Sequence, residues 1–129
     1  MVTTTIDLSN LDGNNGFRLD GGPATLSGVS VSNAGDFNGD GFDDLIIGAP
    51  WAGLNIYDRS GSCYVVFGKD SGFGATLDLT TLNGTNGFRL DESNEASYLG
   101  RTVSNAGRRK AKVRRLIFSL SSRIDWPRP

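Results

Sequence analysis

An internal repeat is the feature that most constrains how this chain folds. Residues 6–20 match 77–91 at an offset of 71 residues, and both stretches end in Gly-Phe-Arg-Leu-Asp. The match resumes at 31–35 and 103–107, where Val-Ser-Asn-Ala-Gly recurs at an offset of 72. A period of this length indicates one supersecondary unit per repeat, and excludes a heptad coiled coil or a solenoid with short rungs.

Four short segments within one period have the patterns of β-strands. Residues 28–32 alternate between polar and apolar, 44–48 form a short apolar run, 62–68 are rich in aromatic and β-branched residues, and 87–90 form a weaker fourth segment. Turn-forming residues separate them. Four strands per period predict an all-β fold: about one four-stranded propeller blade plus parts of its neighbours, an incomplete β-propeller. A β-sandwich with a duplicated hairpin remains the alternative.

This pattern divides the chain into four parts. We expect the end of a preceding blade and a connector in 1–27, a blade in 28–91, and the first strand of a truncated next blade in 92–107. A basic tail, helical or disordered, would follow in 108–129. A closed propeller needs at least four blades. This chain would therefore leave sheet edges open, and we expect self-association through those edges.

The formal net charge of −1 conceals a sharp asymmetry between the body and the tail. Residues 1–107 carry 13 acidic and 5 basic side chains, whereas 108–129 carry 8 basic side chains and one acid. Apolar residues at helical spacing accompany the arginines of the tail. A basic helix of this kind would bind an anionic membrane surface or nucleic acid. Because the tail lacks interleaved aromatic residues or a known nucleic-acid module, we do not expect nucleic acid as a partner.

The residue types that are missing exclude several kinds of chemistry. The chain has no histidine and a single cysteine, Cys63. A Ser-His-Asp triad, an imidazole zinc site and an intrachain disulfide are therefore excluded. The sequence contains no apolar run long enough to span a membrane as a helix, and its first residues lack the pattern of a signal peptide. Cys63 lies in the strongest strand candidate, and we expect it to be a small core residue.

An acidic loop over residues 36–44 carries the clearest functional signal. Side-chain oxygens fall at its first, third, fifth and ninth positions, and glycines at its fourth and sixth positions allow a tight backbone. Calcium prefers six to eight oxygen ligands. We predict a Ca²⁺ site, with magnesium less favoured, whose ligands are Asp36, Asn38, Asp40, the backbone carbonyl of Phe42, and Asp44. An EF-hand is excluded because its twelfth position would be Ile47, and the flanks have strand patterns. The alternative is an acidic turn without a metal.

The same residues resemble the FG-GAP repeat family, whose repeats form the blades of the integrin alpha-chain propeller. The resemblance lies in Ser-Asn-Ala-Gly-Asp at 32–36, the loop 36–44, Gly-Ala-Pro at 48–50 and Tyr-Val-Val-Phe-Gly at 64–68. It implies a seven-bladed extracellular propeller in full-length relatives. It also implies calcium on the five loop residues already predicted.

The second copy of the loop departs from the pattern. Arg108, Lys110, Lys112 and Leu116 stand where the first copy has its acidic and amide ligands, so we predict that this half-site does not bind calcium. One hypothesis is a frameshift, because codons for the basic stretch can encode Phe-Asp-Asp when read one base on. The other is a functional basic tail.

These features together favour a binding protein over an enzyme. We expect a calcium-binding FG-GAP repeat fragment of an extracellular or cell-surface parent that acts in cell adhesion or binds a protein or carbohydrate ligand. Two alternatives remain. The chain would otherwise be the non-catalytic part of a propeller-bearing, phospholipase-like hydrolase, or an anion or nucleic-acid binder that acts through its basic tail.

Overall fold

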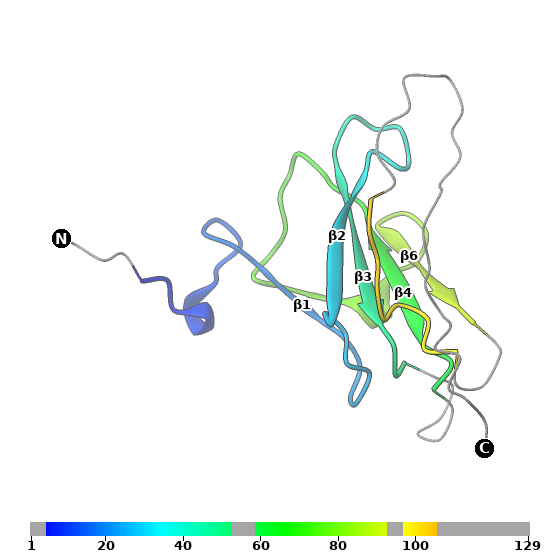
Figure 1. Ribbon diagram of the computed structural model, residues 1–129. Helices are drawn as coiled ribbons and strands as arrows, with labels where there is room; N and C mark the ends of the chain where they lie inside the picture. The colour runs from blue at the N-terminus through cyan, green and yellow to red at the C-terminus, as the bar shows by residue number, and fades with distance from the viewer. Residues whose placement is uncertain (1–4, 53–58, 93–96, 106–129) are drawn as a thin grey trace, which may run out of the picture.

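The computed structural model describes residues 5–52, 59–92 and 97–105. Within them the chain is all-β, with six strands, two short 3₁₀ helices and no α-helix (Figure 1). No helix in these ranges is long and apolar enough to cross a membrane. The elements in chain order are η1 (Leu8–Asn10), β1 (Arg18–Asp20), β2 (Ser30–Gly35), β3 (Asp44–Ala49), β4 (Ser62–Val66), β5 (Thr76–Asp78), η2 (Leu79–Thr81) and β6 (Gly87–Asp91).

Four of the strands form one antiparallel sheet in the order β2-β3-β4-β6. Consecutive antiparallel strands that lie side by side are the arrangement of a propeller blade, so the prediction of an incomplete propeller is confirmed. All four predicted strands are present, with shifted ends. Because Gly28 has a φ of +91°, β2 begins only at Ser30. Because the N–H of Gly68 donates to the carboxylate of Asp44, β4 ends at Val66. The division of the chain into four parts stays a prediction, and the tail at 108–129 lies outside the described residues.

Each face of this sheet carries its own hydrophobic cluster, because successive strand residues point to opposite faces. The first cluster centres on Ile47, Tyr64 and Val66, covered by Leu79 of η2. On the second face, the side chains of Ile46, Cys63 and Val65 are fully buried. Leu99 and Val103, which follow β6 in the chain, cover them.

Cys63 is a core residue, as the sequence predicted. Its side chain is fully buried in the second cluster. Burial raises the pKa of its thiol to about 11, because the thiolate would lose its hydration there. A thiol of this kind is unreactive at neutral pH.

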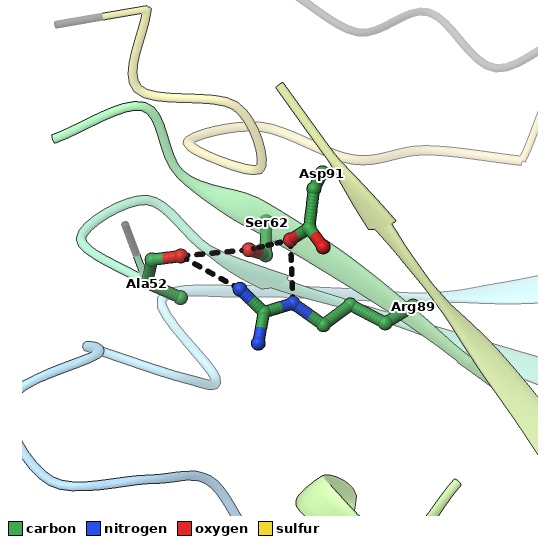
Figure 2. Close-up of polar contacts among 4 residues, drawn as sticks. All are labelled: Ala52, Ser62, Arg89 and Asp91. Carbon is green, nitrogen blue, oxygen red and sulfur yellow. Dashed lines mark hydrogen bonds and ion pairs between the residues drawn. The ribbon is translucent and has the colours of Figure 1, made fainter. Parts of the chain in front are cut away.

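A polar network ties β6 to β4 at the end of the sheet (Figure 2). The Ser62 hydroxyl lies 2.6 Å from the Asp91 carboxylate and 2.8 Å from the Ala52 carbonyl, and Arg89 donates to both of these acceptors. The Arg89 guanidinium also lies 5.8 Å from the centre of the Tyr64 ring. The sequence did not predict this network. It satisfies the buried hydroxyl of Ser62 and fixes the register of β6.

The repeat seen in the sequence recurs in the hydrogen bonds that cap the two 3₁₀ helices. The carboxylate of Asp7 caps η1 through the N–H and hydroxyl of Ser9, and Asp78 caps η2 through Thr80 in the same way. These bonds stabilise the ionised form and lower the pKa of both aspartates. The two copies differ in their surroundings: β6 joins the four-stranded sheet, whereas β1 pairs in parallel with β5.

Gly48 is required by a close approach of two backbones. A Cβ added at this position would lie 1.8 Å from the carbonyl oxygen of Gly100, inside any tolerable contact. We predict that Gly48→Ala lowers the free energy of unfolding by about 1–3 kcal/mol, because overpacking forces the 97–105 segment off the sheet. Urea unfolding measures this. Gly74→Ala is the matched control, because a Cβ there meets no atom within 4 Å. Equal effects of the two substitutions would contradict the prediction.

Candidate metal centre

The acidic loop predicted from the sequence connects β2 to β3 at one end of the sheet. A register shift between Asn33 and Gly35 marks its start, and Gly35 pairs with Asp44 across the two strands. The Asn33 side chain holds this corner: its oxygen accepts the Gly35 N–H at 2.5 Å, and its amide donates to the Asp43 carboxylate at 3.0 Å. The loop is therefore anchored on both sides by the strands that it joins.

The carboxylate of Asp36 organises the backbone of the loop. One of its oxygens accepts N–H groups from Gly39 and Asp40 at 2.7 and 3.0 Å, and the other accepts the Gly41 N–H at 3.0 Å. This turn requires left-handed backbone at both glycines, whose φ values are +80° and +93°. The spacing of glycines that the sequence shows is thus explained by the local fold.

Asn38 and Asp40 form a second group of contacts in the exposed part of the loop. The Asn38 amide donates to one Asp40 oxygen at 2.9 Å, and the other oxygen accepts the Phe42 N–H at 2.9 Å. The Asn38 oxygen accepts the Asp40 N–H at 3.0 Å. Both side chains stay at the surface, where an ion from solvent has access to them.

Asp44 lies at the base of the loop and is fully buried. Its two oxygens accept from different parts of the chain, the Phe37 N–H and the Gly68 N–H, each at 2.8 Å. A buried carboxylate without such partners would be costly. Asp44 therefore joins the loop, the start of β3 and the segment that follows β4.

Three phenylalanine side chains fix the loop to the sheet. The ring of Phe37 lies 6.1 Å from that of Phe67 and 5.1 Å from that of Phe88, and the latter two are 5.9 Å apart. Aromatic pairs at these distances stabilise beyond the area they bury. Sequence reasoning missed this trio because its members come from three separate segments; only the place of Phe37 inside the acidic motif was a signal.

The structure brings the predicted ligands into one loop but does not arrange them as a finished cage. Among the described residues, no three acidic, cysteine or histidine side chains are grouped to hold a metal ion. The carboxylates of Asp36, Asp40 and Asp44 instead accept backbone N–H groups. The chemistry of the donor set still fits calcium, because every predicted ligand atom is an oxygen and a carboxylate has about four acceptor sites. Calcium binding by these residues stays a prediction.

Comparison with known proteins gives the region its family. Residues 27–66 match the family described as FG-GAP repeat. The matched residues are similar to an FG-GAP repeat. They include β2, β3, β4 and the acidic loop, and they confirm the resemblance expected from the sequence.

Curated proteins that are similar to this chain include integrin alpha chains. Integrin alpha pat-2 of Caenorhabditis elegans is 47% identical over 45 residues, which are 35% of this chain and 3% of that protein. Integrin alpha-6 of Gallus gallus is 38% identical over 55 residues, 43% of this chain and 5% of that protein. The human integrin alpha-6 is 36% identical over 55 residues. The chain thus matches only a small part of the length of these relatives.

The two roles open to Asp44 can be separated by experiment. Asp44→Asn replaces one acceptor oxygen with an amide that faces a backbone N–H. We predict a loss of about 2 kcal/mol in the free energy of unfolding, measured by urea unfolding in the presence of a chelator. Asp40→Asn, which changes an exposed carboxylate in the same loop, should cost less than about 1 kcal/mol under these conditions. If both variants unfold like the unaltered chain, Asp44 does not hold the loop.

Proposed function

We propose that this chain is a calcium-binding FG-GAP repeat of an extracellular or cell-surface protein that acts in adhesion or in binding protein or carbohydrate ligands. The similarity to integrin alpha chains supports the adhesion role and the location. The chain itself would not be an enzyme. It has no histidine, and an adhesion repeat needs rigidity and a surface rather than a nucleophile with its base.

The observation that carries the calcium proposal is the all-oxygen donor set on a loop anchored to the blade. Asp36, Asn38 and Asp40 would supply side-chain oxygens, Phe42 its backbone carbonyl, and Asp44 a carboxylate at the base. Bound calcium would neutralise carboxylates that otherwise repel one another within one short turn. Because Asp44 and Phe37 connect this loop to the sheet, an ion in the loop would stiffen the whole end of the blade.

Calcium should therefore raise the stability of the folded chain. At a free calcium concentration ten times the dissociation constant, we predict a gain of about 1.4 kcal/mol in the free energy of unfolding. Thermal unfolding with increasing calcium measures this gain, and magnesium at the same concentrations should give less. Absence of any stabilisation at millimolar calcium would rule out the proposed site, because extracellular calcium modules bind at about 0.1–1 mM.

A matched pair of substitutions distinguishes ligation from a general effect of charge. Asp40→Asn and Asp43→Asn each remove one negative charge from the same loop, but only Asp40 belongs to the proposed ligand set. We expect calcium to stabilise the Asp43→Asn variant nearly as much as the unaltered chain, and the Asp40→Asn variant far less. Equal responses of the two variants would mean that calcium only screens the acidic loop.

A further inference from the structure

The chain contains two copies of one sequence element, and among the described residues the two copies pack differently against the molecule. We call residues 77–92 and 97–105 the wrapping segment and residues 6–33 the N-terminal segment; they are related by the repeat offset of 71 to 72 residues. Residues 16–20 and 87–91 are identical, Gly-Phe-Arg-Leu-Asp. Figure 1 shows the start of the N-terminal segment extending away from the four-stranded sheet.

The two segments share unusual backbone angles at two pairs of equivalent positions. Leu26 and its counterpart Tyr98 both have a φ of +53°, which is unusual for residues other than glycine. The glycines two positions later, Gly28 and Gly100, have φ values of +91° and +86°. The N-terminal segment thus makes the same left-handed turn as the segment that docks elsewhere in the chain.

The wrapping segment shows what this shape binds. β6 pairs along the whole of β4, and Phe88 and Leu90 pack on one face of the sheet. Leu99 and Val103 then cover the same face, while Leu79 covers the opposite face. The segment also makes backbone contacts: the Leu99 N–H donates to the Ser60 carbonyl at 2.9 Å. It therefore encloses the edge of β4 from both sides.

Two apolar positions of the N-terminal segment are exposed where their counterparts are buried, whereas Phe17 and Leu19 are part-buried against Phe73 and the first cluster. Val31 is 63% exposed, whereas its counterpart Val103 is 6% exposed. Leu8 is 73% exposed, whereas Leu79 is 1% exposed. In the described part of the chain, five of the seven large hydrophobic residues that are exposed belong to this segment: Ile6, Leu8, Leu26, Val29 and Val31. β1 has a three-residue pairing with β5, and residues 30–33 of the segment belong to β2, which pairs with β3.

We propose that the N-terminal segment of one molecule docks on the β3–β4 surface of a second molecule of the same chain, in the place of that molecule's wrapping segment. Residues 16–20 take the register of β6 against β4, and Val31 takes the site of Val103. The sequence identity with β6 identifies the occupant, because the segment carries the side chains that the β4 edge already accepts.

An N-terminal segment from a second molecule must compete with the wrapping segment that is already attached to the same chain. This competition sets the protein concentration at which the exchange occurs. A covalently attached segment has an effective concentration in the millimolar range. Dimers and longer head-to-tail assemblies should therefore form when the chain is refolded at about 0.1–1 mM rather than at micromolar concentration. Each exchange buries Leu8 and Val31, whose counterparts Leu79 and Val103 are buried, and frees the wrapping segment to bind in turn.

A disulfide trap tests the register directly. Cys63 is paired with Leu90 across β4 and β6, and Leu19 is the counterpart of Leu90. In the exchanged dimer a Leu19→Cys thiol lies opposite Cys63 of the second molecule, where paired Cα atoms are about 4.5–5.5 Å apart and a disulfide fits. Within one molecule, Leu19 and Cys63 belong to clusters on opposite faces. Refolding with oxidised glutathione should give a disulfide dimer that mass spectrometry maps to these two positions.

Three controls decide how the trap is interpreted. Asp20→Cys presents its thiol to the other face and should give at least about tenfold less dimer. Adding Cys63→Ser should abolish the Leu19→Cys dimer. Leu90→Cys should give an intrachain disulfide in a monomer. Equal dimer yields from Leu19→Cys and Asp20→Cys, or a link between two introduced thiols, would overturn the proposal.

A second measurement does not depend on new thiols. Val31→Arg places a charge at a position that is buried in the docked segment, whereas the counterpart of Val29 is already an exposed arginine, Arg101. In sedimentation after refolding, Val31→Arg should weaken dimerisation at least about tenfold, and Val29→Arg should leave it nearly unchanged. Both residues are exposed in the single molecule, so neither change threatens its fold. A chain that stays monomeric at about 1 mM would also reject the proposal.

Discussion

The buried carboxylate of Asp44 is the interaction on which this end of the molecule depends. Its two oxygens accept one N–H from Phe37 in the acidic loop and one from Gly68, which follows β4. A loop of polar residues cannot by itself bury enough apolar surface to be ordered, so it needs a fixed point inside the blade. Asp44 supplies that point, and the contact of Phe37 with two other phenylalanines supplies a second.

Much of the fold could be predicted from the sequence because the strands of the sheet have strong local patterns. The apolar run at 44–48 and the aromatic and β-branched run at 62–68 correspond to β3 and β4. The strand ends were less accurate, because tertiary contacts decided them: the left-handed backbone of Gly28 delays β2, and the bond from Gly68 to Asp44 stops β4. β5 was not predicted at all. Its three residues alternate between polar and apolar, but a three-residue segment is too short for that alternation to identify a strand.

The candidate site was predicted in its residue types but not in its orientations. Oxygen side chains at alternate positions with two glycines identify the loop. They do not reveal that Asp36 and Asp40 accept backbone N–H groups within the loop, because such bonds depend on the backbone path. The network of Ser62, Arg89 and Asp91 was also hidden, since Arg89 and Asp91 lie 27 and 29 positions after Ser62 and no local pattern connects them to it.

The loop and the surface that the wrapping segment covers are one continuous piece of structure. Phe37 of the loop contacts Phe67 and Phe88, and these two rings pack against the cluster that contains Leu99 and Val103. An ion that stiffens the loop would therefore also fix one wall of the docking surface for the next repeat. In an array of repeats, each loop would then support the contact between its own blade and the one that follows. The sequence from Arg108 onward has arginine and lysine where the first copy has its proposed ligands, so a calcium ion would give no such support to a contact that depends on those residues.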